Sequence, residues 1–256
     1  MAWLEDSQNG DIVQPKYDIY NPTSTQKYRL GTRYHKPDGR TFHYAKAGTT
    51  ALICGDLIQT AVDCFTTNEQ QDVNIATASA VGDDWIYATV GTDAVTEDQL
   101  QDGWIVVSDG TAAQGGGQLY QIKSHPASAA GSIKFNLYDK LNVLVSATGT
   151  SAGLIQNPYK GVVQQPITTP TGFTVGVAPV AVTASYYFWL QTWGMCSCLN
   201  TGGLVVGVQV VTGTAVAGSC GTEVAGGSSV ATPLIGMCGH TADDTDWALI
   251  YLQIAP

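Results

Sequence analysis

The densest run of apolar positions lies at residues 186–193, which read Tyr-Tyr-Phe-Trp-Leu-Gln-Thr-Trp. A second run, residues 204–211, is rich in valine, and Gly194 and an Asn-Thr-Gly-Gly sequence lie between the two. Aromatic and β-branched side chains pack well on a pleated sheet and lose rotamer freedom in a helix. The pattern therefore predicts two strands, the first broken at Gly194. Because residues 186–190 are nearly all apolar, we expect cover on both faces of the first strand, by a second sheet or by a neighbouring subunit.

Turn residues and alternating positions predict further strands. Pro37-Asp38-Gly39 separates two strand-like runs and supplies a preset φ, a side-chain cap and a residue free to take positive φ. It therefore predicts a hairpin over residues 34–44. Other segments with an alternating or β-rich pattern are expected to be strands: residues 51–59, 85–90, 104–108, 118–123, 132–138 and 247–254.

These elements predict an all-β fold, in which antiparallel hairpins and a meander form a β-sandwich or a barrel-like body. Residues 1–33 have no sustained period but carry spaced aromatic residues, so we expect an extended N-terminal arm, lying either on a neighbouring molecule or on its own domain. Residues 34–165 are predicted to form a hairpin and meander domain. Residues 166–256 are predicted to form a C-terminal β domain, either separate or continuous with the preceding part. Residues 157–161 and 166–170 are expected to link the two.

Charge is sparse and unevenly placed. The chain has 12% charged residues and a net charge of −10, yet seven of its eleven Lys and Arg lie in residues 1–46 and none follows Lys160. Such a basic leader either docks on a negatively charged neighbour or is simply solvated. Cations so few and dilute argue against nucleic acid as a partner. We expect no membrane span, because no run of 18 apolar residues occurs, and the first residues lack the pattern of a secretory signal.

Cysteine and histidine, the usual ligands of zinc, show no metal-binding spacing. With no export signal and no Cys-x-x-Cys pair, the cysteines are expected to be free, mostly buried thiols. They are Cys54, Cys64, Cys196, Cys198, Cys220 and Cys238. The histidines are His35, His43, His125 and His240, and none has an evident partner in the sequence. We therefore predict no metal and no cofactor.

Carboxylates are clustered at Asp83-Asp84 and at residues 243–246, which read Asp-Asp-Thr-Asp. Paired carboxylates can cleave glycosides or bind calcium, but only at a set separation, and the second cluster lacks the Gly and Glu of a calcium loop. As turns ahead of Trp85 and Trp247 they need no chemistry. The chain also has no Gly-x-Ser-x-Gly and no His-Glu-x-x-His sequence, and we predict that it is not an enzyme.

Four phrases carry a resemblance to a known family. They are residues 39–48 (Gly-Arg-Thr-Phe-His-Tyr-Ala-Lys-Ala-Gly), 103–110 (Gly-Trp-Ile-Val-Val-Ser-Asp-Gly), 157–163 (Asn-Pro-Tyr-Lys-Gly-Val-Val) and 187–194 (Tyr-Phe-Trp-Leu-Gln-Thr-Trp-Gly). In these phrases the chain resembles head proteins of tailed bacteriophages that are made beside the major capsid protein. Its Gly- and Val-rich closing part is similar to capsid decoration, or cement, proteins. The resemblance covers residues 30–254 in the general character of the sequence, and its motifs are structural. None of them is a catalytic signature.

The resemblance implies a structural virion protein that binds the outside of a phage capsid and stabilises the shell by cementing neighbouring capsomers. Its partners would be the major capsid protein and other copies of itself, as a homotrimer. It would be assembled in the bacterial host cytoplasm and would reside on the capsid surface of the virion.

Aromatic and basic residues of the arm are the expected capsid contacts: Trp3, Lys16, Tyr17, Tyr20, Lys27, Tyr28 and Arg29. The expected subunit interface consists of Tyr187, Trp189 and Trp193. Two other functions stay open. One is a phage fibre or adhesin-like module that binds host surface glycans through exposed Trp and Tyr, and the other is a hydrolase that uses Asp243, Asp244 or Asp246.

Overall fold

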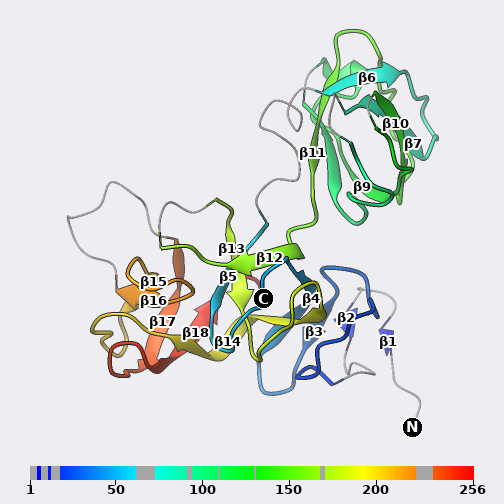
Figure 1. Ribbon diagram of the computed structural model, residues 1–256. Coiled ribbons are helices and arrows are strands. Elements are labelled where there is room, and N and C mark those ends of the chain that lie inside the picture. The colour runs from blue at the N-terminus through cyan, green and yellow to red at the C-terminus, as the bar shows by residue number, and fades with distance from the viewer. Residues whose placement is uncertain are drawn as a thin grey trace. The chain divides into compact units, whose positions relative to one another are not determined.

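The computed structural model of the protein describes residues 5–6, 11–12, 18–61, 73–90, 94–108, 110–129, 131–167, 171–222 and 233–256. The chain divides into two compact units (Figure 1). Unit 1 combines Met1–Val62 with Pro158–Pro256, and unit 2, Asp63–Asn157, is inserted between those segments. The regular structure is almost entirely strand, which confirms the predicted all-β fold. Among the described residues, no helix has the length and apolar character needed to cross a membrane.

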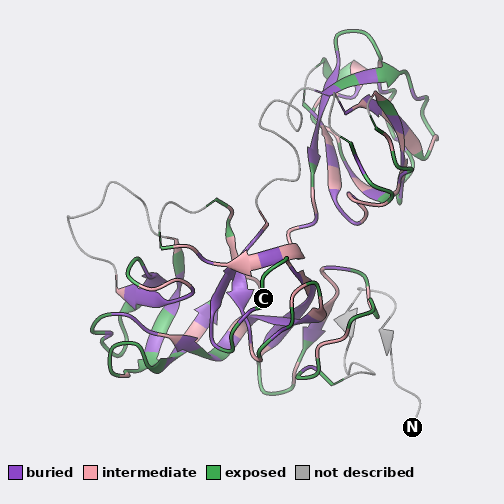
Figure 2. Cartoon of the chain, viewed as in Figure 1, coloured by how far each residue is buried: buried purple, intermediate pink, exposed green. Residues whose placement is uncertain are grey.

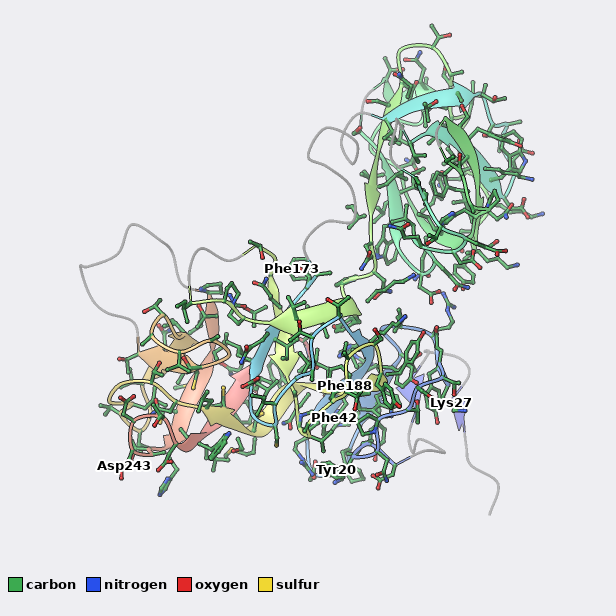
Figure 3. The ribbon with its side chains drawn as sticks, in the orientation of Figure 1. Tyr20, Lys27, Phe42, Phe173, Phe188 and Asp243 are labelled. Carbon is green, nitrogen blue, oxygen red and sulfur yellow. The ribbon has the colours of Figure 1, made fainter. Side chains whose placement is uncertain are left out.

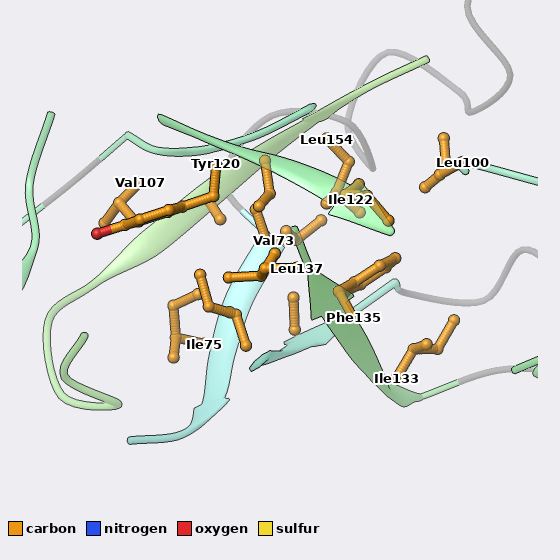
Figure 4. Packing of buried hydrophobic residues seen from close by; sticks show 14 of the residues in the cluster. Val73, Ile75, Leu100, Val107, Tyr120, Ile122, Ile133, Phe135, Leu137 and Leu154 are labelled. Carbon is orange, nitrogen blue, oxygen red and sulfur yellow. The ribbon is translucent and has the colours of Figure 1, made fainter. Parts of the chain in front are cut away.

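Unit 2 is a closed barrel of six strands in the order β10-β7-β6-β11-β8-β9. All its pairings are antiparallel. The strands are β6 (Val73–Thr77), β7 (Trp85–Thr89), β8 (Trp104–Val107), β9 (Leu119–Ser124), β10 (Ser132–Leu137) and β11 (Ser151–Ile155), with a short 3₁₀ helix at Ala112–Gln114. Alternate residues of each strand point inward, and Figure 4 shows apolar side chains of β6, β9 and β10 meeting in the core. Predicted strands 85–90, 104–108, 118–123 and 132–138 are confirmed within one or two residues.

Unit 1 is one sheet of twelve strands in the order β1-β2-β3-β4-β12-β5-β13-β14-β18-β17-β15-β16. Its first strands are β1 (Glu5–Asp6), β2 (Asp11–Ile12), β3 (Arg33–His35), β4 (Thr41–Ala47) and β5 (Leu57–Gln59). After the inserted unit come β12 (Lys160–Gln164), β13 (Thr174–Val177), β14 (Tyr187–Leu199), β15 (Gln209–Thr212), β16 (Cys220–Thr222), β17 (Leu234–His240) and β18 (Trp247–Gln253).

Part of this sheet closes on itself. Strand β4 pairs with both β12 and β14, so β4, β12, β5, β13 and β14 form a ring. A cluster of buried apolar residues from these strands, among them Ile58, Phe188 and Leu190, packs together. Beyond the ring, β18, β17, β15 and β16 extend the sheet from the second half of β14, and β16 is its last strand. We call these four strands the extension.

Strand β14 corrects the prediction of a break at Gly194. The strand runs without interruption from Tyr187 to Leu199, and Gly194 adopts a positive φ of 86° within it. Relative to β4 the chain bulges between Gln191 and Trp193, and the Gln191 amide donates to Trp193 O and Met195 O. A glycine that tolerates positive φ therefore bends the strand and lets its two halves pair with different neighbours.

Several other expectations are corrected in their boundaries. The hairpin at Pro37-Asp38-Gly39 is confirmed, as β3 and β4. In the predicted strand 51–59 only Leu57–Gln59 is a strand, and the predicted strand 204–211 begins at Gln209. Within the predicted linker region, Lys160–Gln164 is strand β12, which pairs in the ring.

The predicted domain boundaries differ from the observed ones. Residues 34–61 belong to the same unit as 158–256, because β4 and β5 pair with β12, β13 and β14. Unit 1 is made of two segments that are far apart in the sequence, so its limits are not marked by a change of composition near residue 165. The predicted boundary between residues 165 and 166 therefore falls inside unit 1, immediately after β12.

The described part of the predicted arm, residues 18–33, lies on unit 1 itself. Ile19 and Leu30 are buried beside Trp189, and the Tyr28 ring lies 5.3 Å from the rings of both Tyr44 and Trp189. The Lys27 N–H donates to Tyr44 Oη, at 3.0 Å. Of the two alternatives for the arm, these residues agree with the one in which it lies on its own domain, because their apolar side chains complete an aromatic cluster of unit 1.

Candidate interaction surface

Two methionines and three aromatic or aliphatic side chains lie side by side on one face of β14, β18 and β17. Met195 of β14 and Met237 of β17 both pair with Tyr251 of β18, so these three side chains form a row across the sheet. Directly paired residues of neighbouring strands point to the same side. Along β18, Leu249 and Trp247 alternate onto that side too. We call this surface the outer face.

The outer face is exposed to an unusual degree for its composition. Met195 is 51% exposed, Met237 42%, Trp247 55% and Leu249 39%. Figure 2 colours the described chain by how far each residue is buried. Leu234, at the start of β17, is 53% exposed. Apolar side chains of this size normally lie inside, and contiguous exposed patches mark sites of contact with another molecule.

No Asp, Glu, Lys or Arg is present in β14, β17 or β18, and the exposed imidazole of His240, at the end of β17, pairs with Leu249. The nearest acids in sequence are in the turn between β17 and β18, at Asp243, Asp244 and Asp246, and no Lys or Arg follows Lys160 in the chain. The outer face therefore offers a partner apolar area and aromatic rings, with charge only at its border.

Aromatic contacts fix two large side chains of the outer face. The rings of Trp193 and Tyr251 meet edge to face at a centroid distance of 6.0 Å. Trp247 Nε1 donates to Cys54 O at 3.2 Å, which orients the indole while leaving more than half of it in water. A side chain that is already fixed in one rotamer loses less conformational entropy on binding, so Trp193, Tyr251 and Trp247 are preorganised for contact with a partner.

The opposite side of the same strands is a core rich in thiols. Cys196, Cys198, Cys220 and Cys238 are buried there among apolar side chains, and together with exposed Cys54 they are free. Burial raises the pKa of Cys196 to about 12 and also raises the pKa of Cys238. A hydrogen bond with Cys220, and then burial, raises the pKa of Cys198. The thiols of Cys196, Cys198 and Cys238 are therefore protonated at neutral pH.

Free, mostly buried thiols were expected, and the described cysteines confirm this. Cys64 lies outside the described residues. Cys196 and Cys198 share one side of β14, as their spacing predicts. Within the described ranges, no three His, Cys, Asp or Glu side chains are grouped so that they could hold a metal ion.

The buried histidines have structural partners. His125 Nε2 accepts from the Leu100 N–H at 2.8 Å, and Nδ1 lies 3.0 Å from Pro126 O, so Nδ1 carries the proton. His43 Nδ1 lies 3.0 Å from Thr192 Oγ1, and its ring stacks on Tyr159 at 4.9 Å. Both arrangements fix the position of an imidazole ring in a core.

The carboxylate clusters cap turns. Asp83 Oδ2 accepts from the Ala80 N–H at 2.8 Å. Asp244 Oδ1 accepts from the Gly202 N–H, also at 2.8 Å, and the Asp246 N–H donates to Asp243 O. The turn interpretation of both clusters agrees with these contacts.

Predicted capsid contacts fall into two groups. Trp3, Lys16 and Tyr17 lie outside the described residues. Tyr20, Lys27 and Arg29 are exposed on residues 18–33, whereas Tyr28 is half-buried in the aromatic cluster. Arg40 donates to Tyr20 Oη at 3.2 Å, which ties this segment to the hairpin of β3 and β4.

Only one of the three predicted interface residues lies on the outer face. Trp193 is half-buried there beside Tyr251. Tyr187 is half-buried and stacks on Tyr44 at 6.0 Å. Trp189 is 2% exposed inside unit 1, so almost none of it is available to a second subunit, and its assignment to an interface is corrected.

Sequence reasoning missed Met195, Met237, Trp247 and Leu249 as contact residues. The signal was present in part, because residues 247–253 alternate and both internal methionines of the chain fall in strands. The register that brings Met195 and Met237 to either side of Tyr251 depends on long-range pairing. Comparisons with protein-family models, with curated proteins and with solved structures gave no match.

Proposed function

We propose that this protein is a structural component of a phage head, which binds the outside of the capsid and cements neighbouring capsomers. The outer face carries the proposal, because it is a broad apolar surface held on rigid strands and without charge. Catalysis needs a few convergent polar groups in a concave site, whereas cementing needs area and stiffness. The resemblance to decoration proteins supports the same function.

The surface proposed to meet the major capsid protein is the exposed part of residues 18–33. Tyr20 and Lys27 lie at the same end of unit 1 as Phe42, and Asp243 lies at the opposite end (Figure 3). Arg29 is exposed on the same segment as Lys27. Seven of the eleven Lys and Arg lie in residues 1–46, so this end is the less acidic one and suits a negatively charged shell.

Shell binding tests the proposal directly. The full-length protein is added to shells assembled from the major capsid protein, and bound copies and the shell's disruption temperature are measured. We expect saturable binding and a higher disruption temperature. The double variant K27E/R29E is expected to bind at least ~10-fold more weakly, because like charges then meet at the contact. Lys123→Glu, an exposed change in unit 2, is the matched control and is expected to bind as the unchanged protein does.

Two results would overturn this proposal. One is the absence of binding to any shell form at saturating protein. The other is equal binding by K27E/R29E, which would remove residues 18–33 as the contact.

One feature of unit 2 favours the alternative of glycan binding. Trp85 and Tyr87 lie on the outside of the barrel, with ring centroids 5.3 Å apart, and Lys134 Nζ lies 5.5 Å from the centre of the Trp85 ring. Asn136 pairs with Trp85 on the neighbouring strand. Half-exposed rings beside amide and ammonium donors suit a sugar, although such cross-strand pairs also stabilise a sheet. Binding of the full chain to bacterial surface polysaccharides that is lost in Trp85→Ala would favour this alternative, and no binding would remove it.

A further inference from the structure

We propose that the outer face is the surface through which copies of this chain associate with one another. This inference rests on the proposed function and deepens it, by naming the surface that copies bound to the same capsid share. The partner is a second copy of the chain, and the row Met195–Tyr251–Met237 lies at the centre of the contact.

Exposed area is the first argument. From their exposed fractions, Met195, Leu234, Met237, Trp247 and Leu249 leave on the order of 500 Å² of apolar surface in water, within the ~300–600 Å² of the largest patch on a typical monomer. Half-buried Trp193 and Tyr251 add to this area, so the outer face supplies the larger part of the ~800 Å² that each partner contributes to a standard interface.

Charge selects the partner. The chain carries a net charge of −10, so two copies repel one another over most of their surfaces. The strands of the outer face have no Asp, Glu, Lys or Arg, so copies can meet there without burying an unpaired carboxylate, ammonium or guanidinium group. An acidic partner would find no Lys or Arg on these strands, and a basic partner no Asp or Glu. A surface that is equally apolar and uncharged is the complement, and a second copy supplies one.

Side-chain chemistry suits self-contact. Both internal methionines are on this face, and an unbranched, polarisable thioether adapts its shape to a copy of itself. Tyr251 and Trp193, already in edge-to-face contact, supply rigid rings at the centre and border. Contact of this face with the same face of a second copy closes as a two-fold dimer, whereas in a homotrimer the face would meet its copies around a three-fold axis.

Sedimentation of the full-length protein tests the inference without any shell. Over about 1 to 100 µM we expect a reversible shift from monomer to a closed oligomer. Met237→Glu and Met195→Glu each place a carboxylate in the row, and each is expected to weaken association at least ~100-fold. Val81→Glu, at a position that is 64% exposed in unit 2, is the matched control and is expected to associate like the unchanged protein.

A second measurement guards against misfolded variants, because it uses the unchanged chain. Hydrogen peroxide converts exposed methionine to the sulfoxide. We expect Met195 and Met237 to be oxidised severalfold more slowly at the concentration where the oligomer forms than in the dilute monomer. The inference is overturned if the protein is monomeric throughout, if both Glu variants associate normally, or if oxidation is independent of concentration. Because no shell is present, these outcomes are separate from failure of capsid binding.

Discussion

Unit 2 and the extension of unit 1 cover their strands in different ways. In unit 2 six strands close into a barrel, every strand has two neighbours, and one apolar cluster fills the interior. The extension is an open sheet whose inner side packs into the thiol-rich core and whose outer side is bare. In a closed barrel every strand edge is hydrogen-bonded and the inward apolar side chains are buried. An open sheet with an apolar face on each side needs a partner to bury the second face.

Outward-facing residues confirm this difference. On the barrel, Lys134 and Asn136 alternate with buried Ile133 and Phe135. On β18, the outward positions between buried Ala248, Ile250 and Leu252 hold Trp, Leu and Tyr. The same period of two thus sets polar side chains outward on β10 and apolar ones outward on β18, although β7 of the barrel also carries half-exposed Trp85 and Tyr87. Unit 2 is therefore expected to be stable by itself, and unit 1 to gain stability by association.

The largest expected effect tests whether the two units are independent. Phe135 in the barrel and Phe188 in the ring are both fully buried, in separate clusters. Phe135→Ala is expected to lower the free energy of unfolding of unit 2 by ~3–5 kcal/mol through the cavity that it leaves. Phe188→Ala is expected to do the same to unit 1. Hydrogen exchange in denaturant, followed separately for peptides of each unit, measures both. Equal loss of protection in both units from either change would show that they unfold as one.

How far the sequence predicts this architecture follows from which signals are local. The barrel strands and the β3–β4 hairpin were predicted, because alternation and the Pro-Asp-Gly turn are features of neighbouring residues. The continuity of β14 through Gly194 was not. Glycine marks a break or a bulge equally well, and only the pairing of β14 with β4 and β18 decides between them.

The candidate surface was predicted less well than the fold. Aromatic richness pointed to residues 187–193, but Trp189 is buried, since residues 18–33 cover it. Whether an aromatic residue is core or surface depends on what packs over it from elsewhere in the chain. The outer face arises from three strands whose register no local pattern specifies.

Alkaline pH is expected to separate the two regions by a smaller effect. In unit 1 burial raises the pKa of Cys196 from 9.0, and that of Tyr159 from 10.0, to about 12. The folded unit therefore keeps protons that the unfolded chain releases, so this stability is present below pH 9 and is lost as pH rises toward 12. Each such group lowers the free energy of unfolding by up to about 1.4 kcal/mol per pH unit in that window.

Denaturant midpoints of each unit between about pH 8 and pH 11 measure this loss. Unit 1 is expected to lose stability more steeply than unit 2, because burial raises the pKa of Tyr34, Tyr44, Tyr159 and Cys196 in unit 1 and of Tyr120 in unit 2. Cys196→Ala removes one titrating thiol and is expected to flatten the slope of unit 1. A parallel decline of both units, or an unchanged slope in Cys196→Ala, would contradict the assignment.

The smallest expected effect concerns how the open sheet is secured near the end of the chain. Thr192 is fully buried, and its Oγ1 donates to Ala255 O at 2.6 Å, while the N–H groups of Ile254 and Ala255 donate to Thr192 O. The barrel needs no such tie, since strand pairing closes it. Thr192→Val keeps the shape of the side chain but removes the hydroxyl from both Ala255 O and His43 Nδ1, and is expected to lower the free energy of unfolding of unit 1 by ~1–3 kcal/mol. Thr89→Val is the control, because it removes a hydroxyl at the barrel surface, 3.1 Å from Ser132 Oγ, and a change within ~0.5 kcal/mol is expected. Faster hydrogen exchange at Ile254 and Ala255 in Thr192→Val, with unit 2 unaffected, would support a stabilising role for the Thr192 hydroxyl. A loss of stability as small as that of Thr89→Val would show that the backbone hydrogen bonds alone hold this segment.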